Sequence, residues 1–453
     1  MKNFIIFPTQ LFEETFEIID KYDFIYIIEE PHYFGSDNIR PNKIKIAYLR
    51  ACMRYYYDNM KKRKKEVNYI EYNSNINYKE LFKNNDLYSY HLNDFKLRDK
   101  LQKHGIIINE IIDSPMFLMK ISDLDNYNKK RKTASHATFY EMVKDKINLL
   151  VGVKNQDVYN RSNPRKIIPF NKNNPNIIEN KDNDSYYKEA IEYVKRPIFN
   201  KNIGDIPLIT TLKNYPITSK DSYKTFNYFI DNNLKNFGLF QDVIQDTNPF
   251  IYHSVISPML NIGIITPVNL INILKKYKDK VPLNTFEGYV RQLMGWREYM
   301  RYLYLYKYKE LIESNNFNNK NRLDKSWYNG TTGLSIIDNE IRKTLIYGYS
   351  HHIIRLMIYL NFMILNEIDP EDIYKWFMEV VCIDAYDWVM IPNIYSMGYF
   401  SKIGMRRPYL SSSNYIIKMS NYKKDGKWDI IWDNKFRSFV KSRKINFYLR
   451  SIK

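Results

Sequence analysis

The sequence predicts an α/β domain with a parallel sheet followed by a larger all-α region, and two patterns of apolar residues lead to this fold class. Over residues 1–125, short apolar runs alternate with stretches of helical spacing, which is the order of elements in an α/β domain. Over residues 191–453, apolar side chains recur at intervals of three and four residues. The length of 453 residues agrees with two or three domains of about 150 residues each.

The strands of the first domain are expected where short apolar runs are bounded by polar residues, because a parallel sheet buries both faces of its strands. These runs cover residues 4–7, 24–28, 67–72 and 106–111. The helices are expected between them, over residues 11–20, 43–61 and 96–104. In the longest of these helices, apolar residues repeat at helical intervals at Ile46, Leu49, Met53, Tyr56 and Tyr57.

Residues 126–190 are predicted to connect the two domains. The stretch over 153–186 has no periodic apolar face and is rich in Asn, Lys and Pro, which favours a linker or an irregular excursion. The sequence SNNFNNK at residues 314–320 predicts a surface loop within the helical domain.

N-cap residues predict where several helices of the second domain begin. Ser257 and Thr266 each precede a proline, which is the pattern of an N-cap followed by the first helical position. Asn284 with Glu287 resembles a capping box that opens a helix extending to about residue 311. Later helices are expected over residues 336–347, 351–366 and 371–383.

The net charge of +19 favours a polyanionic partner. Codons rich in A and T encode Asn, Lys, Ile and Tyr, so part of this charge has a genomic explanation. The excess is concentrated, however, because residues 401–453 contain nine Lys and five Arg against three Asp. This segment is therefore the predicted polyanion-binding surface.

Cysteine content and hydropathy restrict the class of protein further. The two cysteines, Cys52 and Cys382, exclude a disulfide framework and cannot supply four thiolates to a metal site; we expect both to be reduced and buried. No apolar run approaches the ~18 residues of a membrane span. The sequence thus predicts a soluble intracellular protein.

The first candidate site is the segment from His253 to Gly263, HSVISPMLNIG. Hydroxyl groups and free backbone N–H groups gather there at a helix start, where a phosphate could bind. An ordinary capped helix start explains the same residues.

The second candidate site lies on the following long helix. Glu287, Arg291 and Glu298 share one side of it, and Gly295 permits close approach of a neighbour or ligand. Polar groups beside Trp296 suggest the wall of a site, and a solvated ion-pair face with a buried Trp is the alternative.

The third candidate site contains the adjacent histidines His351 and His352 at a helix start. Neighbouring side chains point in different directions, so these two do not form a metal pair by themselves, and no metal site is predicted. Arg355 lies on an apolar helix face and requires a carboxylate partner, for which Asp384 is the candidate. A purely structural role of the histidines is the alternative.

Taken together, these segments resemble the photolyase and cryptochrome flavoproteins, and within them the deoxyribodipyrimidine photolyase-related branch that includes the prokaryotic (6-4) photolyases. The resemblance is carried by IFPTQLF, EEPHYFG, SPMLNIG, EGYVRQLMGWREYMR, GYSHHIIRLM, DAYDWVMIPN and RRPYLSSSNYIIKMS. It implies an antenna-type domain over 1–125, a connecting segment over 126–190 and a helical FAD-binding domain over 191–453. It also implies an enzyme that uses reduced FAD and blue light to split pyrimidine dimers in UV-damaged DNA, as a monomer.

The resemblance assigns roles to individual residues. His352 matches the histidine that donates a proton to a (6-4) photoproduct, and His351 beside it is included as catalytic. Tyr409 and Tyr415 match residues that line the extruded lesion, with Arg406 and Arg407 beside them. The residues matched to FAD contacts are Ser254, Val255, Ile256, Ser257, Met259, Gln292, Trp296, Arg355, Asp384, Tyr386 and Met390.

Two side chains differ from those that the family has at the matching positions, and two tryptophans have no assigned role that is certain from the sequence. Met390 stands where a side chain faces flavin N5, and a Met cannot hydrogen-bond to that atom as an amide or carboxylate can. Leu356 stands where the eukaryotic enzymes have a second histidine. Trp376 and Trp388 could relay an electron to FAD, and core packing explains them equally well.

The iron-sulfur cluster of this branch needs four cysteines, and we predict none here. Where a Cys-x-x-Cys pair is expected, the chain has Ser420 to Trp428 without cysteine, so aromatic packing by Trp428 and Trp432 is predicted to hold this region. A lumazine-type antenna pigment is implied for the first domain, where the acidic turn at Glu29 and Glu30 follows a strand.

Two other functions remain open from the sequence. A cryptochrome-like photoreceptor without repair activity would use the same cavity. A plain nucleic-acid-binding protein would share the basic carboxyl-terminal segment but would leave the cluster of His351, Arg355 and Asp384 unexplained.

Overall fold

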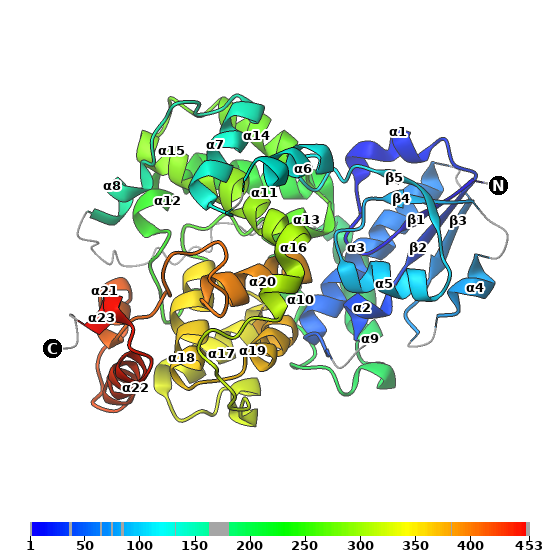
Figure 1. Ribbon diagram of the computed structural model, residues 1–453. Helices are drawn as coiled ribbons and strands as arrows, with labels where there is room; N and C mark the ends of the chain where they lie inside the picture. The colour runs from blue at the N-terminus through cyan, green and yellow to red at the C-terminus, as the bar shows by residue number, and fades with distance from the viewer. Residues whose placement is uncertain are drawn as a thin grey trace. The chain divides into compact units, whose positions relative to one another are not determined.

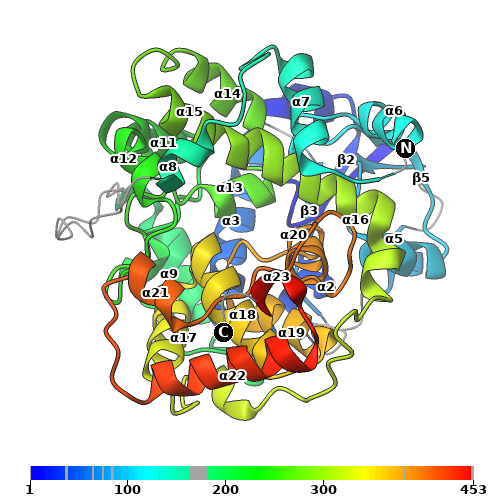
Figure 2. The same cartoon turned by 60° about the vertical axis from the view of Figure 1, so that its left-hand side comes forward.

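The computed structural model describes residues 2–449 except 36–38, 64–65, 74–75, 83–85, 132, 163–180 and 382. The chain forms two compact units (Figures 1 and 2). The first unit comprises Met1–Asn126, Pro175–Asn232 and Ser254–Lys278, and the second comprises Tyr127–Asn174, Asn233–His253 and Asp279–Lys453. The domain limits at residues 125 and 190 stay a prediction.

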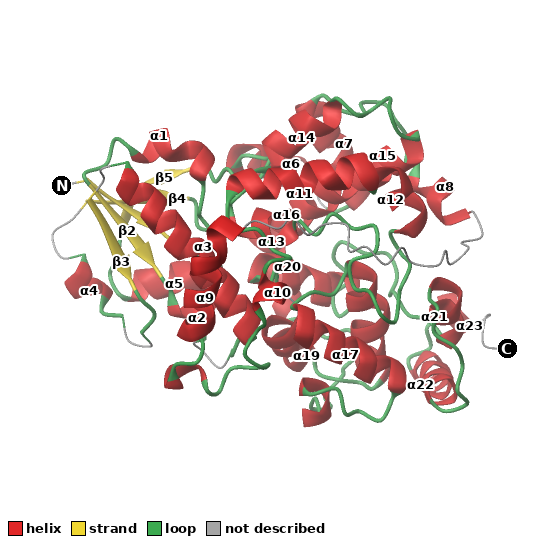
Figure 3. Cartoon of the chain, turned by 180° about the vertical axis from the view of Figure 1, so that it is seen from behind, coloured by secondary structure: helices red, strands yellow, loops and turns green. Residues whose placement is uncertain are grey.

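A five-stranded parallel sheet forms the centre of the first unit, as predicted (Figure 3). The strands are β1(Lys2–Ile6), β2(Phe24–Ile28), β3(Glu66–Ile70), β4(Asp86–Tyr90) and β5(Ile108–Ile112), in the order β3-β2-β1-β4-β5. The predicted strands correspond to β1, β2, β3 and β5. The sequence analysis missed β4, because Asp86 and Ser89 interrupt its apolar residues.

The first unit also contains helices. They are α1(Phe16–Ile19), α2(Pro31–Phe34), α3(Lys43–Lys62), α4(Tyr78–Leu81), α5(Phe95–Lys103), α9(Asp184–Tyr193), α10(Ile209–Leu212), α11(Ser219–Asn232), α13(Ser257–Ile262) and α14(Pro267–Lys275), with short 3-10 turns at 13–15, 181–183 and 197–199. The side chain of Asn42 caps α3 by accepting a hydrogen bond from the N–H of Ile44. Helix α3 buries Ile46, Leu49 and Met53 and packs against β3 and α9.

The second unit is largely helical, as predicted. Its helices are α7(His136–Ile147), α8(Asp157–Ser162), α12(Leu234–Phe240), α15(Leu283–Val290), α16(Arg297–Ile312), α17(Ser335–Tyr347), α18(Asn361–Leu365), α19(Pro370–Trp376), α20(Asp387–Pro392), α21(Ser413–Met419), α22(Trp428–Ser442) and α23(Asn446–Leu449), with a 3-10 turn at 325–328. Helix α6(Ile121–Lys130) carries the chain from one unit to the other. The SNNFNNK segment forms the predicted loop.

Among the described residues of the second unit, four stretches of π-helix interrupt the long helices. They are η4(Arg291–Trp296), η6(Ile354–Leu360), η7(Phe377–Val381) and η8(Asn393–Met397). The helix predicted from Asn284 to Leu311 is thus α15, η4 and α16 in succession. Such wide turns often occur at functional sites because they change the direction of the side chains that follow.

Two predicted helix starts and one predicted linker are wrong in detail. Helix α15 has Pro282 at its N-cap, and the side chain of Asn284 donates to Asn160 rather than forming a capping box. Helix α13 begins at Ser257 itself, with Ile256 at its N-cap. Within the expected linker, residues 157–162 form α8, which packs on α15 through polar side chains and therefore lacks the apolar period that reveals a helix.

Hydropathy along the described helices agrees with the sequence analysis. None of the helices in the described part of the chain combines the length and the apolar character that a membrane crossing requires.

Candidate functional site

A cavity of about 480 Å³ lies within the second unit and brings together residues that are far apart in the sequence. Apolar side chains such as Phe237, Leu356 and Met357 form much of its wall. The predicted site residues on this wall are Gln292, Trp296, His352, Arg407, Tyr409 and Tyr415. A mostly apolar hollow with a few polar groups is typical of a ligand-binding site.

The π-helical turn η4 supplies one wall of the cavity. It carries Gln292 and Trp296, and the indole of Trp296 stacks on the ring of His136 at a centroid distance of 3.9 Å and an angle of 17°. Gly295 allows this contact, because a Cβ at this position would lie 3.0 Å from Nε2 of His136. Burial, with a smaller contribution from Arg291, lowers the pKa of His136 to about 3, so a neutral ring supports the indole.

The two adjacent histidines face different surroundings, as expected for neighbours in a helix. His352 is exposed and lines the cavity. His351 is buried and stacks on His253 at 4.6 Å, and neither of its ring nitrogens has a hydrogen-bond partner among the described residues. Burial, followed by the nearby His253, holds the pKa of His351 well below its usual value. The cavity wall therefore contains His352 and not His351.

The predicted pair of Arg355 and Asp384 is present. Nη2 of Arg355 lies 2.8 Å and 3.1 Å from the two carboxylate oxygens of Asp384, and Nε of Arg355 donates to the carbonyl of Ser350 at 2.6 Å. Both side chains are largely buried, and a buried charge without a partner is destabilising. The guanidinium and the carboxylate therefore stabilise each other. Tyr386 and Met390, which follow Asp384 in the chain, are buried as well.

The residues matched to the FAD phosphates lie at the start of α13. Val255 adopts a φ of +54°, and Ser257 is the first helical residue. Met259 is fully buried, whereas Ser254 and Ser257 are partly exposed. Ser254, Val255, Ile256, Ser257 and Met259 belong to the first unit, and the other residues matched to FAD belong to the second.

The residues of the second unit fit a flavin. A flavin combines an apolar ring face with a row of polar atoms along its edge. The cavity offers apolar surface together with the amide group of Gln292. Outside the cavity wall, the two ring nitrogens of the buried His351 have no hydrogen-bond partner among the described residues. Arg355, in η6, and its partner Asp384 are not among the residues that line the cavity.

The predicted electron-relay residues are both buried. Trp376 donates its Nε1–H to the carbonyl of Trp327 at 2.8 Å, and its ring lies 5.0 Å from that of Tyr359. The guanidinium of Arg297 lies 4.7 Å from the ring centre of Trp388. These contacts agree with core packing, and a relay role for Trp376 and Trp388 stays a prediction.

Aromatic packing holds the carboxyl-terminal helices, as predicted. The rings of Trp428 and Trp432 meet edge to face at 6.2 Å, and Trp432 packs on Phe362 at 4.6 Å. Both indole N–H groups donate to backbone carbonyls. Of the two cysteines, Cys52 is buried and unpaired, and Cys382 lies outside the described residues.

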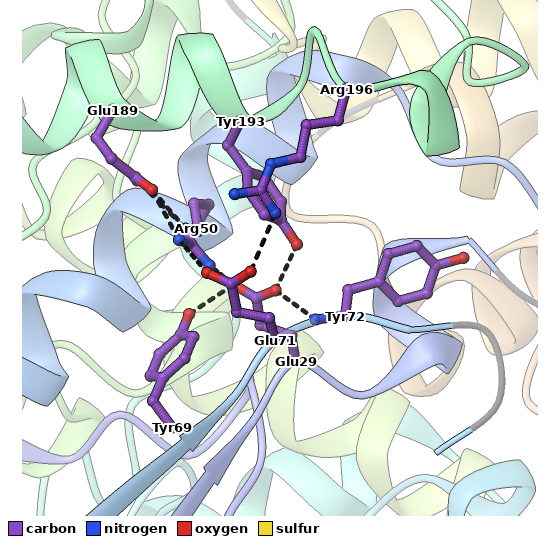
Figure 4. Close-up of polar contacts among 8 residues, drawn as sticks. All are labelled: Glu29, Arg50, Tyr69, Glu71, Tyr72, Glu189, Tyr193 and Arg196. Carbon is purple, nitrogen blue, oxygen red and sulfur yellow. Dashed lines mark hydrogen bonds and ion pairs between the residues drawn. The ribbon is translucent and has the colours of Figure 1, made fainter.

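The acidic turn after β2 contributes Glu29 to a dense polar cluster (Figure 4). The buried carboxylate of Glu29 accepts hydrogen bonds from Arg50, from the hydroxyls of Tyr69 and Tyr193, and from the N–H of Tyr72, at 2.5 to 2.7 Å. Arg50 also binds Glu71 and Glu189, so the cluster joins α9 to α3 and the sheet. With four donors, Glu29 has its hydrogen-bonding capacity filled by the protein itself.

Glu30, the next residue, differs from Glu29. Its Oε1 accepts a hydrogen bond from Lys100, whereas its buried Oε2 has no partner among the described residues. Burial raises the pKa of Glu30, so this carboxyl group can be protonated more readily than usual.

Sequence reasoning missed several residues of the cavity. Phe447 and Tyr448 of α23 lie on its wall, and so does His253. His136 supports Trp296 from behind. His253 opens the segment HSVISPMLNIG but had no role assigned to it, and Phe447, Tyr448 and His136 stand in no motif. For the two histidines, the signal is the scarcity of this residue type, of which the chain has seven.

Comparison with known proteins identifies relatives. A family model described as "Deoxyribodipyrimidine photo-lyase-related protein" matches residues 4–208. The (6-4) photolyase of Agrobacterium fabrum (strain C58 / ATCC 33970) is 32% identical over 321 residues, which are 68% of this chain and 60% of that relative. Uncharacterized protein R855 of Acanthamoeba polyphaga mimivirus is 55% identical over 86 residues, which are 18% of this chain and 69% of that protein.

Solved structures show the same fold. A bacterial class III photolyase from Agrobacterium tumefaciens matches with a TM-score of 0.60 and 17% identity, over 98% of this chain and 88% of the other. The cryptochrome of Synechocystis sp. PCC6803 matches with a TM-score of 0.62 and 14% identity, over 98% and 89% of the two chains. In contrast, this chain spans about 60% of the length of its (6-4) photolyase relative in sequence.

Proposed function

The chain belongs to the deoxyribodipyrimidine photolyase-related family, and from this we propose that it repairs pyrimidine dimers in UV-damaged DNA with the energy of blue light. We propose the (6-4) photoproduct as its substrate. The observation that carries this choice is the presence of His352 on the same cavity wall as Trp296, Tyr409 and Tyr415.

FAD is the proposed cofactor, and when bound it would absorb light and supply one electron to the lesion. In the second unit, Gln292, Trp296, Arg355, Asp384, Tyr386 and Met390 are the residues proposed to hold its flavin part. Ser254, Val255, Ile256, Ser257 and Met259 are proposed for its phosphates and the neighbouring atoms. Among these, Met390 supplies apolar contact and no hydrogen bond.

His352 is proposed to donate a proton to the lesion and to take it back. An imidazole suits both steps because its usual pKa lies near neutral pH. The exposure of His352 at the cavity agrees with this role. The buried His351 supports the site from behind and does not line the cavity.

The aromatic and basic side chains near the cavity are proposed to hold the extruded lesion. Stacking on Tyr409 and Tyr415 would offset part of the few kcal/mol that base extrusion costs. Arg406 and Arg407 are exposed and would bind phosphates of the damaged strand, a contact that depends on salt and not on sequence.

Further proposals rest on the family resemblance together with this chain's own residues, among them its two cysteines. We propose domains over 1–125, 126–190 and 191–453, electron supply through Trp376 and Trp388, and action as a monomer without an iron-sulfur cluster. A lumazine-type antenna pigment could use Glu30, whose Oε2 has no partner among the described residues, but not Glu29, whose acceptors are filled.

The test is light-driven repair by His352→Ala compared with the wild type. Because general acid catalysis contributes about 10² to 10⁴ in rate, we expect restoration of (6-4) lesions, followed by chromatography of irradiated oligonucleotides, to fall by about 100-fold or more. Flavin absorption and binding of damaged DNA should stay close to wild type.

The matched control is His104→Ala, which removes a histidine of the first unit and should leave repair unchanged. Equal repair by His352→Ala and the wild type would contradict the assigned role. A wild type that reduces its flavin in light but restores no lesion would favour a cryptochrome-like photoreceptor instead.

A further inference from the structure

We infer that a second hollow beside the cavity binds an unpaired nucleotide adjoining the lesion, with Phe447 as its stacking platform. This inference deepens the proposed function and rests on it. The second hollow, called the side hollow below, has a volume of about 670 Å³ and is lined by Asn414, Tyr415, Phe436, Arg437, Phe447 and Tyr448, among others.

The side hollow adjoins the cavity directly. Leu410, Ser411, Tyr415, Phe447 and Tyr448 line both spaces, so these five residues form the wall between them. They come from two short stretches, the loop and first turn of α21 and the helix α23. Helix α22 packs against both α21 and α23, and the three helices lie near the carboxyl terminus in Figure 1. A strand whose damaged bases occupy the cavity would therefore bring its next nucleotide to the side hollow.

Phe447 has the surroundings of a stacking platform rather than of a core residue. Its side chain is 56% exposed although it lies at the boundary of the two spaces. The guanidinium of Arg407 lies 4.4 Å from its ring centre, and the ring of Tyr448 meets it edge to face at 4.9 Å. A Phe ring packed between a cation and a second aromatic ring, and still open to solvent, can accept a nucleobase.

The position of Phe447 is fixed by its neighbour. The hydroxyl of Tyr448 donates to the carbonyl of Pro408 at 2.8 Å and accepts a hydrogen bond from the N–H of Leu410 at 3.3 Å. The ring of Tyr448 also packs on Phe436 of α22 at 5.8 Å. These contacts hold α23 against the loop that carries Tyr409. The binding of a base therefore costs little additional conformational entropy in this part of the protein.

The charges around the side hollow suit a nucleotide. The exposed side chain of Arg437 lines the side hollow. Arg407 and Lys418 are exposed as well and line the adjoining cavity. Of the described residues on the wall of the side hollow, Asp433 is the acidic one, and its carboxylate is occupied by the N–H and Oγ of Ser413 at 2.8 and 2.9 Å. Aromatic rings interleaved with cations are the usual means of binding single-stranded nucleic acid.

A stacking site beside the cavity would stabilise the DNA strand after the lesion has been extruded. When two linked bases leave the duplex, the neighbouring base loses its stacking partner. Phe447 would replace that partner, and it would thereby hold the damaged strand in place while the lesion occupies the cavity.

The test compares Phe447→Ala with Phe447→Tyr, which keeps the ring. Each protein is titrated in the dark with a single-stranded oligonucleotide that carries 2-aminopurine next to a (6-4) lesion, and the quenching of fluorescence reports stacking. We expect Phe447→Ala to lose the quenching and to bind about tenfold more weakly, as base stacking on an aromatic ring predicts, and Phe447→Tyr to resemble the wild type. Ile430→Ala, which removes another exposed apolar side chain (52% exposed) of the same region, should leave both signals unchanged.

A second measurement uses repair of the oligonucleotide and of the lesion dinucleotide, which has no neighbouring base. The loss in Phe447→Ala should be about tenfold greater for the oligonucleotide. Equal losses on both substrates, or quenching that persists in Phe447→Ala, would overturn the inference. If the wild type repairs neither substrate but Phe447→Ala alone loses the quenching, the inference stands and the proposed repair activity fails.

Discussion

At the scale of single residues, the adjacent histidines show how much a motif can and cannot tell. The sequence GYSHHIIRLM places both at a helix start, and their different directions follow from helix geometry. Which of them meets the ligand depends on the residues packed around the turn. His253, distant in sequence, covers His351 and leaves His352 at the cavity.

The pair of Arg355 and Asp384 could be predicted from the sequence, because a charged residue on an apolar helix face needs a partner. We expect Asp384→Ala to destabilise the protein by about 3 to 5 kcal/mol, since it leaves a buried guanidinium unpaired, and to lower the flavin content. The measurement is urea unfolding with flavin absorption recorded on the same samples.

The control for Asp384→Ala is Glu192→Ala, which breaks the exposed pair of Lys195 and Glu192. That substitution should cost less than about 1 kcal/mol, because water screens exposed ion pairs. Similar costs for the two substitutions would contradict a buried, structurally important pair.

His136 predicts a dependence of stability on pH. Its pKa is about 3 in the folded protein and near 6.5 when unfolded, so the unfolded chain binds the proton more tightly between these values. The contribution of His136 is therefore complete above pH 6.5 and is lost as the pH falls towards 3. Between pH 7 and pH 5, the loss amounts to about 2 kcal/mol.

The substitution His136→Phe keeps an aromatic ring against Trp296 and removes the titrating group. We expect its unfolding free energy to fall by about 2 kcal/mol less than that of the wild type between pH 7 and pH 5. Chemical unfolding at a series of pH values measures this difference. Parallel pH profiles for the two proteins would show that His136 is not buried in its neutral form.

At the scale of elements, periodicity predicted most of the fold, and it failed where side chains other than apolar ones direct the packing. Strands β1, β2, β3 and β5 are apolar runs, whereas β4 mixes Asp86 and Ser89 with buried Leu87 and Tyr90. Helix α8 has no apolar face because Asn160 and Asp157 are its buried residues. The π-helical turns also escape prediction, because the described helices that contain them are buried on most sides and show no single apolar face whose shift would reveal the additional residue.

The packing of α8 on α12 and α15 depends on a glycine. A Cβ on Gly238 would lie 2.5 Å from Oδ1 of Asn160 and 2.6 Å from Oγ1 of Thr285. In an open helix, Gly→Ala stabilises by about 1 kcal/mol, but here the overpacking of buried side chains outweighs this gain. We expect Gly238→Ala to lower the unfolding free energy by about 1 to 3 kcal/mol in urea unfolding.

A second substitution locates the cause of that loss. Asn160→Ala, combined with Gly238→Ala, removes the nearer of the two clashing groups, and its effect should be smaller than the sum of the single effects. If Gly238→Ala were as stable as the wild type, the close contact between α8 and α12 would be absent.

The polar cluster around Arg50 shows the same limit of sequence reasoning. The acidic turn at Glu29 and Glu30 predicts a ligand at the end of a strand. The structure gives Glu29 four donors from β3, α3, α9 and the chain after β3, which are 21 to 164 residues away in sequence. No local sequence pattern predicts such a cluster, because its members are single residues on separate elements.

At the scale of the whole molecule, composition indicated a partner before any site was known. The net charge is +19, and residues 401–453 carry nine Lys and five Arg against three Asp, which is more than half of the excess. The same segment provides Arg407, Tyr409, Tyr415 and Phe447 to the cavity wall. Charge and aromatic side chains thus meet where a damaged strand would have to bind.

The most direct test of the central claim is repair by the purified wild-type protein. The flavin is first identified by its absorption, and duplexes with a single (6-4) photoproduct or a single cyclobutane dimer are then incubated in blue light and in the dark. The account predicts that (6-4) lesions return to intact pyrimidines in the light alone and that cyclobutane dimers remain. Loss of (6-4) lesions in the dark, or no loss in the light by a protein that contains reduced flavin, would contradict it.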